Sequence, residues 1–218
     1  MVLHLDALLV LLVTDGRGDV DRLRALVRDA VAGGVRAVQL REPNLSARHL
    51  AELADELRPV LDAVNGYLLL NDRVDVAAAG HAHGAQVGYR SLSPRNARSV
   101  LGTGRLLGCS VHNEIQLAEA ATAGADFAVL APVFATASKP GVPPLGVELA
   151  GRWTAAAELP VLWLGGVTPD HVASIVALPR QHQPCGVAVL GGICSAAHPR
   201  TAAARYCEVA ASLGKSAR

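Results

Sequence analysis

His112 is the side chain of this sequence best suited to carry a proton near neutral pH. It stands in the segment GCSVHN, directly after an apolar run that ends at Cys109 and Ser110. Histidine is the common acid/base side chain of enzymes because it titrates close to neutrality. Asn113 and Gln116 have the spacing of a helix cap, which leaves His112 just outside the helix that follows. On spacing alone, a proton carrier and an ordinary loop histidine are both open interpretations.

Two glycine pairs are the second feature suited to chemistry. Gly165-Gly166 and Gly191-Gly192 each follow an apolar run and precede a segment with helical character. Glycine lets backbone N–H groups approach a ligand closely, and a helix N-terminus adds a field that favours anions. The pattern favours a phosphate site, with simple glycine turns as the alternative.

Arg41 and Asn71 also end apolar runs. An arginine there is expected to pair with Glu42 or Asp72, or to hold an anionic substrate group in a bidentate way. Asn71 and Ser110 are candidate substrate-binding residues at the same positions of their runs. Asp72 alone is not a magnesium site, so the residues predict no metal.

The longest polar segment, residues 132–146, is rich in Gly, Pro, Ser and Thr and has the composition of a loop. A long loop beside a site is a candidate lid, although an ordinary surface excursion has the same composition. Thr136 and Lys139 lie within it. Lys139 either neutralises an anion or is a solvated loop lysine.

These residues are positioned by a regular alternation of two patterns. Eight short apolar runs alternate with eight Ala/Leu-rich segments of helical periodicity, and the runs are continuously apolar, which is typical of parallel strands covered on both faces. The predicted strands are Ala7–Val13, Ala37–Arg41, Tyr67–Asn71, Gly84–Gly88, Arg105–Cys109, Phe127–Ala131, Pro160–Leu164 and Gly186–Leu190. The predicted helices are Val20–Ala32, Ser46–Val64, Val74–Ala79, Pro94–Leu101, Glu114–Ala123, Val147–Ala157, Asp170–Ala177 and Pro199–Leu213.

Eight β/α units in 218 residues predict an α/β fold of one domain, residues 1–218, a short (β/α)8 or TIM barrel. An open doubly wound sheet is the alternative, but it would gather ligand-binding residues at one switch point. Here polar groups follow nearly every strand, which in a barrel places all of them on the rim that carries active sites. The residues after Gly192 are expected to form a short extra helix.

Composition narrows the class of protein further. The net charge of +1, with both signs interspersed, argues against a nucleic-acid partner. The apolar run Ala7–Val13 is too short for a membrane span, and it is not preceded by the basic residues that begin a signal peptide. The four cysteines show no metal-binding spacing, which favours reduced thiols in the cytoplasm. His81 and His83 are expected in a surface turn. Self-association into a homo-oligomer is left open.

In chain order, the motifs LLVTD, VQLRE, LLLNDRVDVA, GAQVGYRSLSP, GCSVHN, ADFAVLAPVFATASKPG, LWLGGVTPD and GVAVLGGI resemble those of the thiamine phosphate synthase/TenI family. The resemblance runs from Leu11 to about Tyr206 and implies a TIM barrel. Two activities share this family. A synthase couples a pyrimidine diphosphate to a thiazole phosphate with Mg²⁺, and a thiazole tautomerase aromatises a carboxythiazole phosphate without metal.

Two departures from the synthase pattern favour the tautomerase. Pro43 stands where the synthase has a lysine, and Arg90 and Ser91 stand where it has an acidic residue that completes the magnesium site with the match of Asp72. The segment SVH matches the tautomerase histidine as His112, although synthases carry a similar STH. Asn71-Asp72 and the loop from Thr136 to Lys139 resemble the synthase instead.

The resemblance therefore implies a cytoplasmic, metal-free isomerase whose small-molecule substrate is a thiazole phosphate. His112 would move the proton, and Arg41, Asn71, Ser110, Thr136 and Lys139 would bind the substrate. Its phosphate would lie on Gly165, Gly166, Gly191 and Gly192. A Mg²⁺-dependent thiamine phosphate synthase is the alternative, and a regulatory protein that kept the pocket but lost the chemistry is a third reading.

Overall fold

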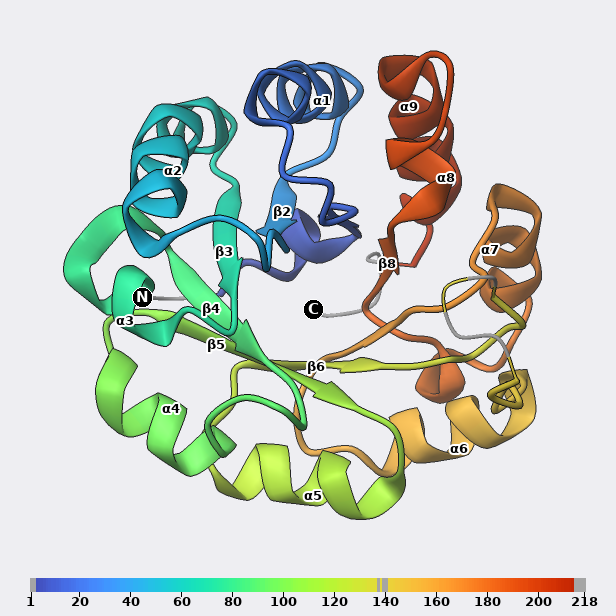
Figure 1. The fold of residues 1–218 in the computed structure, drawn as a ribbon. Helices are drawn as coiled ribbons and strands as arrows, with labels where there is room; N and C mark the ends of the chain where they lie inside the picture. The colour runs from blue at the N-terminus through green and yellow to red at the C-terminus, as the bar shows by residue number, and fades with distance from the viewer. Residues whose placement is uncertain (1–2, 137, 139–140, 214–218) are drawn as a thin grey trace.

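A computed structural model describes residues 3–136, 138 and 141–213 of the chain. Eight parallel strands close into a barrel in sequence order, and the helices ring its outside, which confirms the predicted fold (Figure 1). Each strand is buried along most or all of its length, because side chains on one face enter the barrel and those on the other meet helices. The strands are β1 (Val10–Val13), β2 (Ala37–Leu40), β3 (Tyr67–Asn71), β4 (Gly84–Val87), β5 (Leu106–Val111), β6 (Phe127–Leu130), β7 (Val161–Trp163) and β8 (Gly186–Val189).

Several helices begin directly after polar residues whose side chains cap them, and the cap at Asn113 is the one predicted above. The side chains of Ser46, Ser93, Asn113 and Thr168 each accept a hydrogen bond from the backbone N–H three residues later. The main helices are α1 (Val20–Ala32), α2 (Ala47–Asp62), α4 (Pro94–Leu101), α5 (Glu114–Thr122), α6 (Val147–Ala156), α7 (Pro169–Val176) and α9 (Pro199–Ala210). The shorter ones are α3 (Val74–Val76), η2 (Ala77–His81), η3 (Arg180–His182) and the predicted extra helix, α8 (Gly191–Cys194).

The N-terminal strand is shorter than predicted. Residues Leu5–Leu8 form a 3-10 helix, η1, and only Val10–Val13 pair as β1. Ala7 and Leu8 are fully buried and pack with the side chains inside the barrel, including Leu11 and Tyr67. They are apolar because they plug the amino-terminal mouth of the barrel, a role that a run of apolar letters cannot distinguish from a strand.

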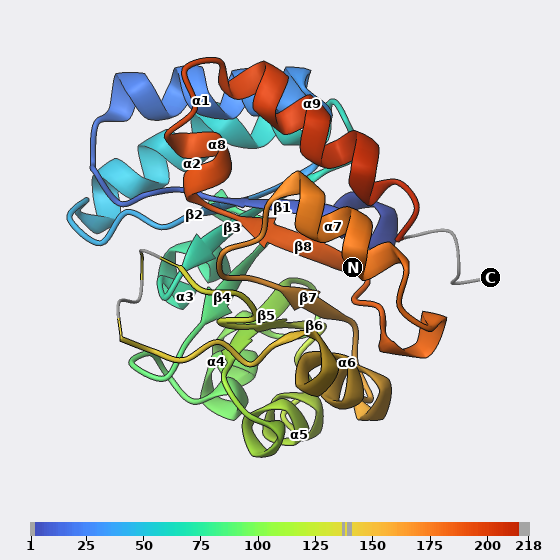
Figure 2. The same cartoon turned by 90° about the vertical axis from the view of Figure 1, so that its right-hand side faces the viewer.

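The loops that follow the strands gather at one end of the barrel, on the left in Figure 2, while η1 lies at the other end. Strand β5 runs two residues further toward this end than predicted, so Ser110 lies within the strand and His112 follows it directly. None of the helices in the described ranges is long and apolar enough to cross a membrane.

Candidate active site

Four polar side chains line one side of the barrel interior near its carboxyl end. Gln39, Asn71, Gln86 and Ser110 stand two residues after interior positions of β2, β3, β4 and β5, so the alternation of side chains turns them inward as well. The matching positions on other strands, among them Val13 and Val129, are apolar. The mouth of the barrel therefore has a polar side and an apolar side.

The floor of this mouth is the ring of Phe127. A Cβ added at Gly108 would lie 2.4 Å from Cζ of Phe127, so the glycine is what lets the ring cross the barrel there. Phe127 is fully buried. It seals the barrel beneath the polar side chains and leaves them facing the open end.

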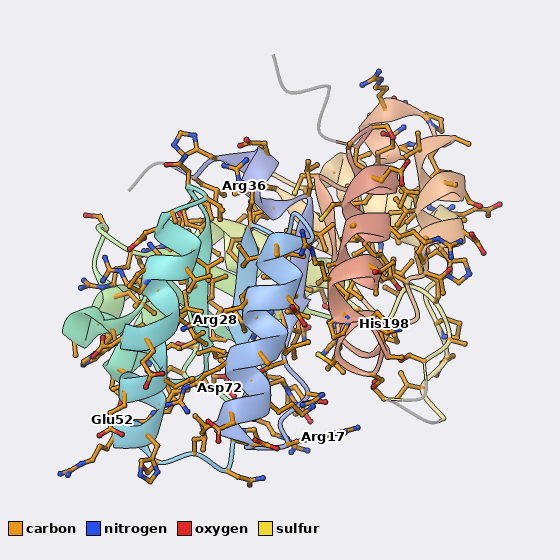
Figure 3. The ribbon with its side chains drawn as sticks, turned by 90° about the horizontal axis from the view of Figure 1, so that it is seen from above. Arg17, Arg28, Arg36, Glu52, Asp72 and His198 are labelled. Carbon is orange, nitrogen blue, oxygen red and sulfur yellow. The ribbon has the colours of Figure 1, made fainter. Side chains whose placement is uncertain are left out.

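Two of the polar side chains are bonded to each other and to the rim. Gln39 Nε2 donates to Asn71 Oδ1 at 2.8 Å, and Asn71 Nδ2 donates to Asp72 Oδ2 at 2.8 Å. Asp72 has φ of +60°, a conformation that aspartate tolerates better than most residues. Ser91, in the loop after β4, donates its hydroxyl hydrogen to Asp72 Oδ1 and accepts from the Gly88 N–H. Figure 3 shows Asp72 toward the Arg17 end of the molecule, opposite Arg36.

The other two polar side chains form a separate pair. Gln86 Nε2 donates to Ser110 Oγ at 2.9 Å, and Gln86 is only 2 % exposed. Sequence reasoning identified Asn71 and Ser110 but missed the two glutamines. A glutamine inside an otherwise apolar predicted strand was the available signal, since buried polar side chains need a partner or a purpose.

His112 lies on the rim directly after β5. Its Nδ1 is 2.6 Å from the carbonyl oxygen of Ala131, which follows β6. The predicted cap is present, because Asn113 Oδ1 accepts from the Gln116 N–H. Gln116 Oε1 accepts from the His112 N–H at 2.8 Å. The Gln116 side chain therefore bonds to the residue before the cap, His112, and not to the cap residue Asn113 itself. The Tyr89 ring stands edge-on to the imidazole of His112, and the Arg90 guanidinium carbon lies 5.3 Å from the centroid of the Tyr89 ring.

Arg41 is exposed at the end of β2 and makes no ion pair with any residue in the described ranges. Of the two alternatives given by the sequence, pairing with Glu42 or Asp72 is therefore wrong, and binding of an anionic substrate group stays a prediction. Glu42 does not pair with Arg41 because its carboxylate is hydrogen-bonded to the loop after β1. Its carboxylate accepts from the Thr14 hydroxyl at 2.6 Å and from the Gly18 N–H at 2.8 Å. Thr14 Oγ1 also accepts from the Arg41 N–H at 2.8 Å, so the loop after β1 fixes the backbone of Arg41 and leaves its guanidinium available.

The glycine pair after β7 is required by packing. Gly165 and Gly166 both have positive φ. A Cβ at Gly166 would lie 2.2 Å from the Ala135 carbonyl oxygen, and one at Gly165 would lie 2.8 Å from Pro132. The loops after β6 and β7 are thus in close contact, which holds the backbone of Gly166 at the rim.

The two glycines after β8, Gly191 and Gly192, differ in how much space surrounds them. A Cβ at Gly192 would lie 2.2 Å from the Tyr206 hydroxyl, whereas one at Gly191 would meet nothing within 4 Å. Tyr206, on α9, donates to the Val167 carbonyl oxygen at 2.9 Å. The tyrosine therefore joins the loops after β7 and β8, the two loops predicted to bind phosphate.

The structure describes only part of the loop that was predicted to form a lid, residues 132–146. Thr136 is half-buried and its hydroxyl accepts from the Ser138 N–H, while Lys139 lies outside the described residues. At the start of this loop the Phe134 ring stacks on His171 with centroids 3.9 Å apart, and His171 Nδ1 lies 2.9 Å from the Gly166 carbonyl oxygen. The base of the loop is thereby tied to the glycine loop after β7.

Among the described residues, no group of three or more His, Cys, Asp or Glu side chains is arranged to hold a metal ion. His81 and His83 lie just before β4, away from the rim, but His83 is not in the surface turn that was predicted for both. It is 7 % exposed, accepts from the Leu68 N–H and bonds to Asp62.

The chain matches the family model described as "Thiamine monophosphate synthase" over residues 10–205. A provisionally named thiamine-phosphate synthase of Geobacter sulfurreducens is 40 % identical over 82 % of this chain and 82 % of its own length. The thiamine-phosphate synthase of Roseiflexus castenholzii is 37 % identical over 93 % of this chain and 88 % of its own.

The fold is similar to that of a solved thiamine phosphate pyrophosphorylase from Pyrococcus furiosus. The TM-score is 0.83 at 25 % sequence identity, covering 96 % of this chain and 98 % of the other. These names agree with the synthase, the alternative activity implied by the sequence, and not with the tautomerase that Pro43 and Ser91 favour.

Proposed function

The chain belongs to the thiamine monophosphate synthase family, and we propose that it joins a hydroxymethylpyrimidine diphosphate to a thiazole phosphate to give thiamine phosphate. One observation carries this choice over the tautomerase. Eight relatives named as thiamine-phosphate synthases, one of them provisionally, are 33–40 % identical over 82–96 % of this chain.

The proposed reaction makes modest demands on acid/base chemistry. The lone pair of the thiazole nitrogen forms a bond to the methylene carbon of the pyrimidine, and the bond from that carbon to the diphosphate oxygen breaks. The diphosphate leaves with the electron pair. Because the attacking nitrogen carries no proton, no general base is needed, and the main task of the site is to orient two ligands and stabilise the leaving charge.

The leaving diphosphate is assigned to the rim around β2, β3 and β4. Arg41 is exposed there without an ion pair to a described residue, and Arg90 follows β4. Asp72 would hold a Mg²⁺ ion that arrives with the diphosphate, since magnesium is commonly bound by one or two carboxylates together with substrate phosphates. The ion would supply neutralisation of the developing charge. Because Ser91 stands in place of a second carboxylate, these side chains fit an ion that is held jointly with the substrate diphosphate better than an ion that is bound by the protein alone.

The thiazole phosphate is assigned to the opposite part of the rim. The backbone at Gly165, Gly166, Gly191 and Gly192 would hold its phosphate, and Tyr206 keeps the two loops together. Thr136 and Lys139 would contact it from the loop after β6. Asn71 and Ser110 would contact whichever substrate ring lies nearest to the barrel interior. A cytoplasmic location and self-association stay predictions.

A coupling assay tests the proposal directly. The purified protein is supplied with both substrates and a series of Mg²⁺ concentrations, and thiamine phosphate is quantified by conversion to fluorescent thiochrome. We expect Mg²⁺-dependent product at an ordinary enzymatic rate of about 1 s⁻¹ or more. Product formation no faster than without protein would overturn the proposal.

A metal-free thiazole tautomerase is the second candidate, because Ser91 and Pro43 stand where the synthase pattern expects an acid and a lysine. His112 is oriented by Ala131 at the rim and would carry the proton. Conversion of the carboxythiazole phosphate, with no coupling, would establish this activity instead. Phosphate-ligand binding with neither reaction would identify the regulatory protein considered from the sequence.

A further inference from the structure

Arg22, near the start of α1, joins two segments that lie far apart in the sequence. Its Nη1 and Nη2 donate to the two carboxylate oxygens of Asp15 at 3.0 and 2.8 Å, and Nη2 also donates to the carbonyl oxygen of Cys194 at 2.8 Å. Asp15 lies in the loop after β1, and Cys194 is the last residue of α8. A single guanidinium therefore fixes the loop after β1 against the segment after β8.

The ion pair at the centre of this bridge is largely shielded from solvent. The side chain of Asp15 is 8 % exposed and that of Arg22 is 28 % exposed. Burial alone would raise the pKa of Asp15, but the Arg22 guanidinium outweighs this effect and holds the pKa below its usual value. The carboxylate is therefore ionised at neutral pH, and its two hydrogen bonds to Arg22 are charge-assisted.

Helix α8 has one buried end and one exposed end. Cys194 is buried, whereas Gly191 and Gly192 are exposed at the rim, and a Cβ at Gly191 would meet nothing within 4 Å. The helix has four residues, so its own hydrogen bonds cannot hold it in place. Its position depends on the side chains around it, which include Tyr206 at Gly192 and Arg22 at the Cys194 carbonyl.

We propose that Arg22 is a positioning residue for the phosphate of the thiazole substrate. By holding Cys194, it fixes the exposed glycine backbone at the other end of α8, where that phosphate binds. The proposal rests on the proposed function, which assigns the phosphate to these glycines. Arg22 acts through α8, since Asp15 and Cys194 occupy its guanidinium. Backbone N–H groups bind an anion most tightly when their positions are fixed before it arrives.

Arg22→Met tests this role by direct binding, because it keeps most of the apolar stem and removes the guanidinium. Each protein is titrated by calorimetry with thiazole phosphate alone and, separately, with the pyrimidine diphosphate and Mg²⁺. We expect Arg22→Met to bind thiazole phosphate about tenfold more weakly, the effect of losing a hydrogen bond to a charged group. Its affinity for the pyrimidine diphosphate should change much less, because that ligand does not use α8.

Arg24→Met is the matched control. Arg24 also lies on α1 and forms a bidentate ion pair, but its partners are Glu56 on α2 and Asp21 on α1 itself. The variant loses the same charge and a comparable ion pair without touching the segment after β8. It should bind thiazole phosphate as tightly as the wild type.

Asp15→Asn separates positioning from simple attraction between charges. Removing a carboxylate near the rim would, by charge alone, favour the binding of an anion. Positioning predicts the opposite, because a neutral amide holds Arg22 less firmly than a carboxylate does. We therefore expect Asp15→Asn to bind thiazole phosphate more weakly than the wild type. This variant also keeps the test available if thermal unfolding shows that Arg22→Met does not fold.

The outcomes distinguish this inference from the proposed function. Binding of thiazole phosphate by Asp15→Asn as tight as that of the wild type, or equal losses in Arg22→Met and Arg24→Met, would overturn the positioning role. Binding that depends on Arg22, with no product in the coupling assay, would overturn the proposed function alone. Coupling by the wild type with no dependence of thiazole phosphate binding on Arg22 would overturn this inference alone.

Discussion

The Tyr206 hydroxyl donates a 2.9 Å hydrogen bond to the carbonyl oxygen of Val167, which joins helix α9 to the loop after β7. The same hydroxyl occupies the space where a Cβ of residue 192 would lie. Two loops from neighbouring strands are therefore held at a fixed separation by one side chain. In the proposed synthase, that separation sets the position of the phosphate.

Gly192→Ala should break this arrangement. The added Cβ would lie 2.2 Å from the Tyr206 hydroxyl, so the tyrosine must move away from Val167. We expect a loss of about 1–3 kcal/mol in the free energy of unfolding, as for other overpacked sites, together with weaker binding of thiazole phosphate. Chemical denaturation and calorimetry measure the two effects. Gly191→Ala is the control for stability, because its Cβ would meet nothing within 4 Å. Equal stability loss in both variants would contradict the role of Tyr206.

Glu42 should be a positioning residue for Arg41. Its buried carboxylate ties together the Thr14 hydroxyl and the Gly18 N–H, and Thr14 in turn holds the Arg41 backbone. In Glu42→Gln, the amide NH₂ would face an N–H or O–H donor. We expect stability to fall by about 2 kcal/mol and the KM for the pyrimidine diphosphate to rise more than the KM for the thiazole phosphate.

Denaturant melts and steady-state kinetics measure these changes. Glu52→Gln, on the exposed surface of α2, is the matched control and should change stability by less than about 0.5 kcal/mol. If the KM values for both substrates rose equally in Glu42→Gln, its effect would be a general loss of structure.

Ser91→Asp should strengthen magnesium binding. The new carboxylate would stand beside Asp72, where the Ser91 hydroxyl now bonds to it, and Mg²⁺ favours anionic oxygen ligands. We expect the Mg²⁺ concentration for half-maximal coupling to fall by about tenfold, on the view that one added ligand contributes about 1.4 kcal/mol. Ser91→Ala, which adds no ligand, should not lower it. A Mg²⁺ requirement that did not respond to the added carboxylate would place the ion elsewhere.

His83 should make stability depend on pH. Burial holds the pKa of His83 below its usual value, and the hydrogen bond to Asp62 offsets this only in part. The unfolded chain takes up the proton first as pH falls below about 6.5, so the folded state loses stability down to the lowered pKa, by up to about 1.4 kcal/mol per pH unit. Urea melts between pH 5 and 8 should show a shallower slope for His83→Gln than for the wild type. His49→Gln, at an exposed site, should keep the wild-type slope.

The parts of the fold that depend on local signals were predictable from the sequence. The apolar runs, the helical periodicity and the cap at Asn113 predict most strand and helix boundaries to within a few residues of those observed. The contacts that define the site join residues far apart in the chain. Three such contacts exist only because the barrel closes: the hydrogen bond from Gln86 to Ser110, the contact of Tyr206 with Gly192, and the hydrogen bonds of Glu42 to the loop after β1. The spacing of these residues along the chain does not predict them.

The hydrogen bond between His112 Nδ1 and the Ala131 carbonyl oxygen bears on the choice of reaction. Because a carbonyl only accepts, Nδ1 carries the hydrogen, which leaves Nε2 as the nitrogen for proton transfer. In His112→Asn, the amide NH₂ can keep the donor toward Ala131 while Nε2 is lost. The variant therefore removes the proton carrier with little change in shape.

Thiamine phosphate formation by His112→Asn, compared with the wild type at saturating Mg²⁺, tests the synthase assignment most directly. Since the thiazole nitrogen has no proton to lose, we predict a coupling rate within about tenfold of the wild type, well short of the 10²–10⁴-fold that acid/base catalysis supplies. Wild-type protein that makes no thiamine phosphate, yet isomerises the carboxythiazole phosphate in a reaction abolished by His112→Asn, would contradict the account.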